Sequence, residues 1–123
     1  MARIKGKGTG PEMNVRRAAH AIGLRFRLHR ADLPGKPDLI FPKFRLALFV
    51  HGCFWHQHEG CRRASMPKSR TEYWHPKLQR NLDRDKRNQD ALQGLGWRVE
   101  TLWECEVSTQ AAAEHKLGEL ISQ

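Results

Sequence analysis

The chain has 123 residues and a formal net charge of +9. This length fits one domain and is too short for two complete hydrophobic cores. No apolar run is long enough to cross a membrane and no secretion signal opens the sequence, which predicts a soluble, cytoplasmic protein. Three cysteines do not form the disulfide framework of a small secreted domain, and in a reducing compartment cysteines more often bind a metal.

The positive charge is concentrated in the first two-thirds of the chain. Residues 1–87 hold 20 of the 22 Lys and Arg but only 7 of the 13 Asp and Glu, a balance of +13, whereas the remainder has a balance of −4. A basic surface of this size favours a polyanionic partner, and nucleic acid is the first candidate. The alternative is a basic surface that is merely solvated.

The N-terminal segment predicts a flexible basic arm followed by a helix. Residues 1–10 are basic and glycine-rich, with little to bury. Thr9 is suited to cap the helix, and Glu12 three residues later completes a capping box. Apolar residues then repeat at helical spacing until Gly23, which is expected to end the helix.

Three strands are predicted next. Residues 24–28 alternate apolar and basic side chains, which is typical of a strand with one solvated face. Residues 33–37 have the composition of a turn. The short apolar segment 38–41 and the apolar run 44–50 then predict two strands joined as a hairpin at residues 42–43.

A long charged helix is predicted in the second half of the chain. Ser69 and Glu72 have the spacing of a second capping box, and Gly94 and Gly96 provide the stop. Its apolar face is predicted from residues one turn apart: Trp74, Leu78 and Leu82.

The C-terminal part predicts one strand and one helix. Residues 97–103 alternate in polarity, and we interpret Trp97 and Trp103 as core residues of this strand. Cys105 lies just beyond it. Ser108 is suited to cap a final helix.

The order of predicted elements is α-β-β-β-α-β-α. It predicts a small α/β domain with a mixed β-sheet flanked by helices, covering residues 11–123 after the arm of residues 1–10. The sequence contains no internal repeat and no sign of a second domain.

Residues 51–61, which follow the predicted strand 44–50, contain three histidines and two cysteines. The three cysteines of the chain supply the sulfur for a closed zinc site: Cys53, Cys61 and Cys105. One histidine would complete a tetrahedral set of three cysteines and one histidine. Spacing alone does not choose between His56 and His58. The alternatives are cysteines buried as small hydrophobic residues, or a hydrolytic zinc with an open water position.

Asp38 begins a strand whose neighbour ends in His51. A carboxylate in this position can bind Mg²⁺, which phosphodiester cleavage uses to polarise the phosphate and activate water. His51 and His56 are suited to move a proton near neutral pH. The alternative for Asp38 is a turn-forming role. Glu12 is another acidic residue, and the capping box already accounts for it without a catalytic role.

Aromatic and cationic residues alternate around the predicted metal loop, as they do on surfaces that bind nucleic acid. The cations are Arg62, Arg63, Lys68 and Arg70. Phe54, Trp55 and Trp74 could stack on bases or wedge between them, while the cations hold phosphates. The alternatives are core packing for Trp74 and burial under the metal loop for Phe54 and Trp55.

A series of motifs occurs in register along the chain: Leu33-Pro34-Gly35-Lys36-Pro37-Asp38, the run from Phe49 to His56, Tyr73-Trp74, Asn81, Arg84-Asp85, Gly96-Trp97 and Trp103-Glu104-Cys105. With these motifs the sequence resembles the very short patch repair (Vsr) mismatch endonucleases from about Met1 to Glu106. The resemblance implies a restriction-endonuclease-like fold with a structural zinc. It also implies Mg²⁺-dependent nicking of duplex DNA 5′ to the thymine of a T·G mismatch.

The resemblance also implies partners. They are mismatched double-stranded DNA and mismatch-repair proteins, with the enzyme acting in the bacterial cytoplasm, at the nucleoid. We also expect a monomer, since one active site makes one nick. Members of the family usually begin before the position of Met1 with an arm that clamps DNA, so an arm of residues 1–10 is short for the family.

The resemblance assigns roles by position. Asp38 matches the catalytic metal-binding aspartate, and Val50 matches a residue whose main-chain carbonyl helps to hold the metal. His51 and His56 match two catalytic histidines, and Glu12 matches an acidic residue of the same water shell. The zinc ligands implied in this way are Cys53, His58, Cys61 and Cys105. The implied aromatic wedge is Phe54, Trp55 and Trp74.

Two other functions remain open at this point. One is a zinc-stabilised DNA-binding module without catalysis. The other is a related nuclease with a different DNA specificity.

Overall fold

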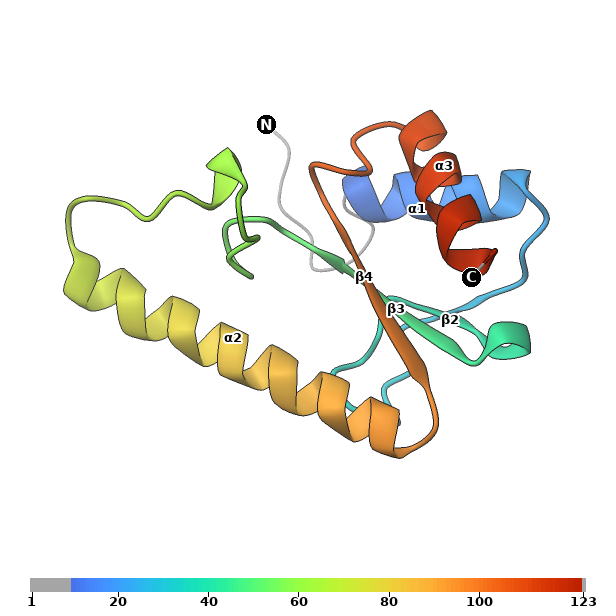
Figure 1. Cartoon of the computed structure of the whole chain (residues 1–123), viewed down its shortest axis with the longest axis horizontal. Helices are drawn as coiled ribbons and strands as arrows, with labels where there is room; N and C mark the ends of the chain where they lie inside the picture. The colour runs from blue at the N-terminus through green and yellow to red at the C-terminus, as the bar shows by residue number, and fades with distance from the viewer. Residues whose placement is uncertain (1–9, 123) are drawn as a thin grey trace.

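The computed structural model describes residues 10–122, and these residues form three α-helices and a four-stranded sheet in the predicted order (Figure 1). The elements are α1 (Gly10–Ala21), β1 (Arg27–Leu28), β2 (Leu39–Phe41), β3 (Leu46–His51), α2 (Thr71–Gly94), β4 (Arg98–Trp103) and α3 (Gln110–Ile121). Two short 3₁₀ helices, η1 (Pro42–Phe44) and η2 (Arg62–Ala64), lie in the connections. The predicted arm lies outside the described residues except for Gly10, which already belongs to α1.

The sheet is mixed, as predicted, with the strand order β1-β2-β3-β4. β1 and β2, and β2 and β3, pair antiparallel, which confirms the hairpin. β3 and β4 pair in parallel over six residues, from Leu46 opposite Arg98 to His51 opposite Trp103. Because β3 lies between two strands and under helices, its apolar run is almost fully buried.

Helices cover both faces of the sheet. On one face α1 and α3 pack side by side, as Figure 1 shows. Successive residues of β2 point to opposite faces, so Leu39 and Phe41 join this core, whereas Ile40 joins a smaller core with Leu92 of α2. Each fully buried Leu, Ile or Phe contributes about 1.5–3 kcal/mol relative to exposure. This packing fixes the ends of β2 and β3.

Both predicted helix stops at glycine are confirmed. Beyond α1, Leu24 N–H donates to the carbonyl of Ala19 at 2.8 Å, and Gly23 between them has φ +80°. Beyond α2, Trp97 N–H donates to the carbonyl of Leu92 at 3.0 Å across Gly96, which has φ +95°. Such a left-handed residue is costly for any side chain with a Cβ, which explains glycine at both positions.

Both predicted N-caps on serine are wrong. α2 begins at Thr71 after Arg70, which has φ +58° and makes no side-chain cap, so Glu72 lies in the first turn without a capping box. α3 is capped by Thr109, whose Oγ1 accepts from Ala112 N–H at 3.1 Å, and not by Ser108. In each case a neighbouring residue sets the path of the chain into the helix.

Two predicted strands are shorter than expected. Only residues 27–28 of the segment 24–28 pair with β2, since Leu24 and Phe26 turn onto the core instead. In the run 44–50, Phe44 belongs to a 3₁₀ turn that Arg45 closes with φ +49°.

α2 is less buried than its pattern predicted. Leu82 is 37% exposed, and only Leu78 and Leu92 are buried, because much of this helix extends beyond the sheet (Figure 1). Within the described residues, no helix combines the length and the apolarity that crossing a bilayer requires.

Two glycine substitutions with opposite expected effects test the helix ends. Gly23→Ala forces a Cβ into a left-handed residue and is expected to cost about 1–2 kcal/mol, lowering Tm by about 5 °C. Gly118→Ala, the control inside α3 with open space around it, is expected to gain about 0.5–1 kcal/mol. Thermal unfolding followed by circular dichroism measures both. Equal effects of the same sign would contradict the assigned helix ends.

Candidate active site and metal centre

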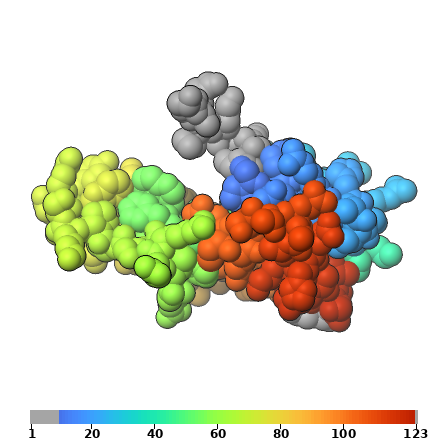
Figure 2. Space-filling view, turned by 90° about the horizontal axis from the view of Figure 1, so that it is seen from above, coloured from blue at the N-terminus to red at the C-terminus, as the bar shows by residue number. Residues whose placement is uncertain are grey.

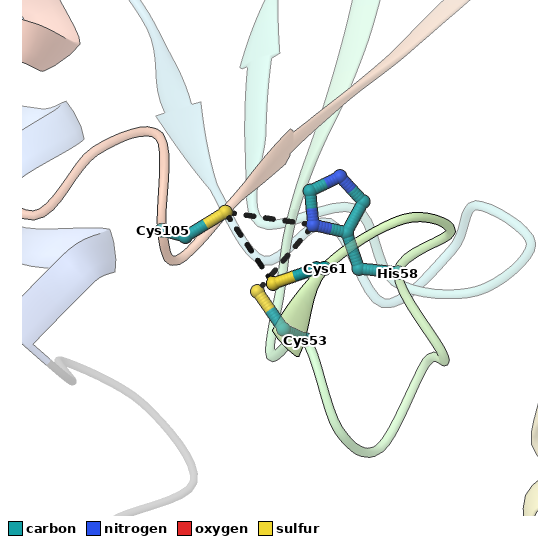
Figure 3. Close-up of side chains that lie close together, drawn as sticks. All are labelled: Cys53, His58, Cys61 and Cys105. Atoms are coloured by element: carbon teal, nitrogen blue, oxygen red, sulfur yellow. Dashed lines mark hydrogen bonds between the residues drawn. The ribbon is translucent and has the colours of Figure 1, made fainter. Parts of the chain in front are cut away.

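The three cysteines and His58 come together beyond the carboxyl ends of β3 and β4 (Figure 3). Nδ1 of His58 lies 3.6 Å from Sγ of Cys53 and 3.5 Å from Sγ of Cys105, and Sγ of Cys61 lies 3.9 Å from Sγ of Cys105. A tetrahedral zinc with Zn–S of about 2.3 Å and Zn–N of about 2.0–2.1 Å requires separations of about 3.6 Å for S···N and about 3.8 Å for S···S. The four side chains therefore fit a structural metal without rearrangement.

The main chain of the loop after β3 is folded around this cluster. His58 N–H donates to the carbonyl of Cys53 at 2.9 Å, and Cys61 N–H donates to the carbonyl of His58 at 3.2 Å. Glu104, next to the third cysteine, accepts a hydrogen bond from Cys53 N–H at 2.9 Å. These bonds tie the loop to the end of β4. Figure 2 shows the loop and the beginning of α2 gathered at one end of the molecule, away from α3.

Trp103 belongs to this site, and its assignment to the core was wrong. Its ring is half-buried and stacks on the ring of His58, with the ring centroids 4.2 Å apart and an angle of 8° between the planes. It also makes an edge-to-face contact with the ring of His51, with the centroids 5.4 Å apart and the planes at 74°. Trp103 is the last residue of β4, opposite His51, so its side chain packs between the cysteine–histidine cluster and the residues described next.

Asp38, His51 and His56 line one cleft of about 630 Å³, together with Val50 and Asp85. The antiparallel pairing of β2 and β3 brings Asp38, just before β2, to the end of β3. There Oδ2 of Asp38 accepts a hydrogen bond from Val50 N–H at 2.7 Å. The sequence prediction that these three side chains meet in one small volume agrees with this arrangement.

The environment of Asp38 favours its protonated form. The pKa of this carboxyl is raised from 3.8 to about 6, chiefly by burial and also by the negative charge of Glu12. The Val50 hydrogen bond and the positive charges that His29 and His56 can carry lower the pKa and so offset part of this effect. A bound cation would offset this cost, because it would supply the charge that the surrounding residues do not.

His51 and His56 form a stacked pair, with ring centroids 3.7 Å apart and planes at 7°. Nδ1 of His56 lies 2.6 Å from Oδ2 of Asp85 in α2. A carboxylate can only accept, so Nδ1 of His56 carries the proton and its Nε2 is free to accept another. Burial and the neighbouring His56 lower the pKa of His51 to about 4, which keeps His51 neutral near pH 7.

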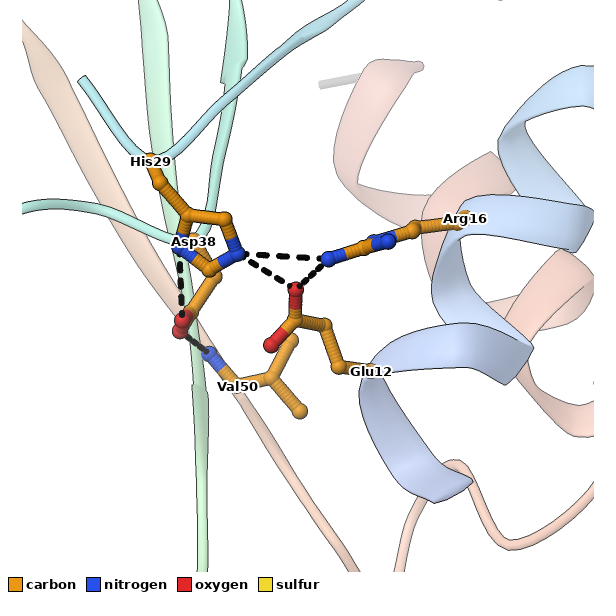
Figure 4. A network of polar contacts seen from close by, with 5 residues as sticks. All are labelled: Glu12, Arg16, His29, Asp38 and Val50. Carbon is orange, nitrogen blue, oxygen red and sulfur yellow. Dashed lines mark hydrogen bonds and ion pairs between the residues drawn. The ribbon is translucent and has the colours of Figure 1, made fainter. Parts of the chain in front are cut away.

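Glu12 lies on the other side of Asp38 and is buried in α1, with 3% of its surface exposed (Figure 4). Its Oε2 contacts the guanidinium of Arg16 and lies 2.9 Å from Nε2 of His29. These contacts direct the side chain of Glu12 toward the neighbourhood of Asp38. The predicted capping partner of Glu12, Thr9, lies outside the described residues.

Two residues of this region were missed from the sequence. His29 follows β1 and carries no recognisable spacing, and Asp85 lies inside a long charged helix. Asp85 was seen only within the motif Arg84-Asp85, without a role. In both cases only the fold brings the side chain to the cleft.

The predicted aromatic residues form one cluster on the loop and the start of α2. Phe54 lies 5.1 Å from Trp55 and 5.5 Å from Trp74, ring to ring, and Tyr73 lies 4.9 Å from Trp74. Trp55 is 45% exposed. Asn81 donates to the carbonyl of Trp55 at 3.1 Å, which fixes the cluster to α2. Trp74 therefore packs on other aromatic rings and not in the core.

The predicted DNA-binding cations surround this cluster and are all exposed: Arg62, Arg63, Lys68 and Arg70. Arg70 lies over the ring of Tyr73 at 5.0 Å, and Arg63 is 3.8 Å from a carboxylate oxygen of Glu104. The four cations and the exposed rings of Trp55 and Tyr73 thus belong to the segment that runs from the loop after β3 to the first turn of α2.

Comparison with known proteins shows the family to which the chain belongs. The sequence model of the family described as DNA mismatch endonuclease Vsr matches residues 1–63. The type II nicking enzyme V.XorIIP of Xanthomonas oryzae pv. oryzae is 53% identical over 121 residues, which is 98% of this chain and 88% of that protein. The chain belongs to the Vsr family.

Two further relatives match along nearly the whole chain. The DNA mismatch endonuclease Vsr of Escherichia coli (strain K12) is 40% identical over 126 residues, covering 98% of this chain and 80% of that protein. The type II nicking enzyme V.NmeAIP of Neisseria meningitidis is 36% identical over 123 residues, covering 100% of this chain and 87% of that protein. The resemblance found from the sequence motifs is thereby confirmed.

The metal cluster leads to a first prediction for this site. Elemental analysis is expected to find one zinc per chain, and Cys105→Ala and His58→Ala are expected to lose it. Tm then falls by about 10 °C or more, because a structural zinc contributes several kcal/mol to folding. His115→Ala, at an exposed position of α3, is the control and retains zinc. A chain that keeps its full Tm in chelator with no bound metal would refute a structural metal.

The buried carboxyl of Asp38 leads to a second prediction. Its folded-state pKa lies above its unfolded value, so the folded state binds this proton more tightly and the free energy of unfolding falls as pH rises from about 4 to about 6. Without added divalent ion, Asp38→Asn is expected to gain on the order of 2 kcal/mol over wild type at pH 8, and less at pH 5. Asp32→Asn, an exposed control, gains nothing. A Tm difference that does not change between pH 5 and pH 8 would contradict the shifted pKa.

Proposed function

We propose that this protein is a Mg²⁺-dependent endonuclease that nicks one strand of duplex DNA 5′ to the thymine of a T·G mismatch, in very short patch repair. As a member of the Vsr family, the chain is a DNA endonuclease. The observation that carries the finer proposal is the cleft in which the half-buried Asp38 faces a histidine pair oriented by Asp85.

Asp38 and the main-chain carbonyl of Val50 are the proposed ligands for Mg²⁺. Mg²⁺ takes few protein oxygens and keeps water in its remaining positions, which suits an open cleft with one carboxylate. When bound, it supplies charge that polarises the scissile phosphate and lowers the pKa of a water molecule. Val50 N–H holds Oδ2 of Asp38 in place and so orients the carboxylate.

The histidine pair is proposed to move the proton of the reaction. His56 is fixed through Nδ1 by Asp85, so its Nε2 is presented to the cleft as the group that takes or returns a proton. His51 stays neutral beside it and can hold a water molecule or the phosphate by a hydrogen bond. Glu12 is proposed to act from the far side of Asp38, through the water molecules that would surround the Mg²⁺ ion.

The zinc and the aromatic cluster are proposed to prepare DNA binding. Zn²⁺ held by Cys53, His58, Cys61 and Cys105 would fix the loop that carries Phe54 and Trp55. Together with Trp74 these rings are suited to wedge beside a mispaired step, where unstacking costs least. The exposed cations around them, Arg62, Arg63, Lys68 and Arg70, would hold phosphates, which predicts strong salt dependence.

One site that cuts one strand needs no second subunit, so we propose a monomer that acts on the chromosome in the bacterial cytoplasm. Mismatch-repair proteins are proposed as partners in the same pathway.

Two alternatives are less well supported. A DNA-binding module without catalysis gives no reason for the pairing of His56 with Asp85 or for a carboxyl as costly to ionise as Asp38. A nuclease of another specificity is a real competitor, because two of the relatives described above are named type II nicking enzymes. Substrate comparison separates it from the leading proposal.

The test is strand nicking of an end-labelled duplex with one T·G mismatch, beside the matched T·A duplex and other mismatches. Wild type is expected to nick only the T·G duplex, with added Mg²⁺ and not in chelator. Asp38→Ala is expected to abolish nicking. Asp85→Asn reduces the rate by about 10²–10⁴-fold, because the orientation of His56 is lost. The control His115→Ala has wild-type activity.

Binding is measured in parallel so that each failure has one meaning. Nicking that persists in Asp38→Ala would refute the assigned metal ligand. Mg²⁺-dependent nicking of all duplexes would show a different specificity. Binding without nicking under any condition would favour the DNA-binding module.

A further inference from the structure

We propose that His29 is a direct nitrogen ligand of the divalent cation held by Asp38, and that Glu12 and Arg16 orient its ring for this purpose. The inference rests on the proposed function only in taking Asp38 as a cation ligand. With His29 as a ligand, the cation site combines an imidazole nitrogen with oxygen ligands instead of having oxygen ligands alone.

The fold places His29 against Asp38 by two connections. The main-chain N–H of His29 donates to the carbonyl of Asp38 at 3.2 Å, continuing the pairing of β1 with β2. His29 itself has φ +49°, a left-handed conformation that costs a residue with a Cβ about 1 kcal/mol or more. This turn directs the ring at Asp38 and Glu12 (Figure 4).

The two ring nitrogens of His29 face different groups. Nε2 lies 2.9 Å from Oε2 of Glu12 and 3.2 Å from a guanidinium nitrogen of Arg16. The guanidinium donates to the same carboxylate oxygen of Glu12, so the shorter contact decides the tautomer: the carboxylate can only accept, and Nε2 carries the proton. Nδ1 therefore has a free lone pair, and it faces Oδ1 of Asp38 at 4.0 Å. This separation is too long for a hydrogen bond.

Two electron-rich atoms thus face each other across a gap that suits a cation. Ligand bonds of about 2.1–2.2 Å to a Mg²⁺ or Mn²⁺ ion span up to about 4.3 Å, so both atoms can reach one ion with a small rotation. Glu12, His29 and Asp38 also offer ligand atoms that all lie within 4.8 Å of one another. Within the described part of the chain, the hydrogen-bond contacts of the His29 ring all involve Nε2, so none competes for Nδ1.

The support around His29 is that of a metal-binding histidine. Such a histidine usually donates its other N–H to a carboxylate, which fixes the tautomer and the ring orientation. Glu12 provides that carboxylate, with only 3% of its surface exposed, and the guanidinium of Arg16 neutralises it. The charge of Glu12 is therefore already balanced, whereas that of Asp38 is not.

An imidazole ligand changes which ions the site prefers. Mg²⁺ binds oxygen ligands almost exclusively, whereas Mn²⁺, which also prefers oxygen, accepts an imidazole nitrogen more readily. We therefore expect His29 to contribute more to the affinity for Mn²⁺ than to the affinity for Mg²⁺.

The experiment detects the nitrogen directly on zinc-loaded protein with Mn²⁺ as the probe. Pulsed electron paramagnetic resonance of bound Mn²⁺ is expected to show a ¹⁴N coupling in wild type and in the exposed control His115→Gln, and to lose it in His29→Gln. The Kd for Mn²⁺, from titration of the free-ion signal, is expected to rise about tenfold in His29→Gln. The half-saturating Mg²⁺ concentration, from competition with Mn²⁺, changes by about twofold or less.

Further variants separate the other sources of nitrogen. His51→Gln is expected to keep the coupling, so a coupling that vanishes there and survives in His29→Gln would overturn the proposal. A wild type with bound Mn²⁺ and no ¹⁴N coupling would do the same. If His29→Gln does not fold, broadening of the ring ¹⁵N signals of His29 in wild type by substoichiometric Mn²⁺ gives the answer, and unbroadened signals refute the ligand.

The nicking assay keeps this inference apart from the proposed function. A wild type that nicks T·G duplexes with Mg²⁺ but shows no nitrogen coupling would retain the function and lose the ligand. A wild type that binds Mn²⁺ through His29 and nicks no DNA would retain the ligand and lose the function.

Discussion

The parallel pairing of β3 with β4 is the constraint on which the site depends. Carboxyl ends of parallel strands lie at the same edge of a sheet, so the register that sets His51 beside Trp103 also brings Cys53 and Cys105 to one place. The two cysteines are 52 positions apart in sequence, and no local interaction could hold them together. A metal held by the three cysteines and His58 would then fix the loop after β3, which carries His56 and the exposed rings.

Ring contacts connect the cysteine–histidine cluster to the cleft that Asp38 and the histidine pair line. His58 lies flat on Trp103, whose edge meets His51, and His51 lies flat on His56. Ring contacts of this kind contribute about 0.5–1.5 kcal/mol each beyond burial and depend strongly on geometry. Displacement of His58 would therefore be transmitted through Trp103 to the histidine pair, which gives the metal cluster a part in orienting His51 and His56.

The sequence could predict those features of the structure that depend on residues close together in the chain. Apolar runs and glycines predicted the element order, the hairpin and the helix stops, because strands, helices and left-handed turns depend on nearby residues. Cap positions at Ser69 and Ser108 failed, since the path of the chain into a helix is set by residues outside the pattern. His29, Asp85 and Trp103 acquire their positions only from long-range contacts, so their neighbours in sequence gave no indication of them.

The charges of the cleft explain why cation and DNA binding should be coupled. Glu12 is neutralised by Arg16, and Asp85 is paired with His56. The carboxylate of Asp38, among the described residues, accepts one hydrogen bond from the main chain, and the ring of His29 lies 4.0 Å from it. A phosphate entering the cleft would add negative charge beside a carboxylate that burial already makes hard to ionise. A divalent ion between the two converts this repulsion into attraction. With a divalent ion at Asp38, each of the two ligands would therefore strengthen binding of the other, which is the linkage that the proposed metal-dependent nicking requires.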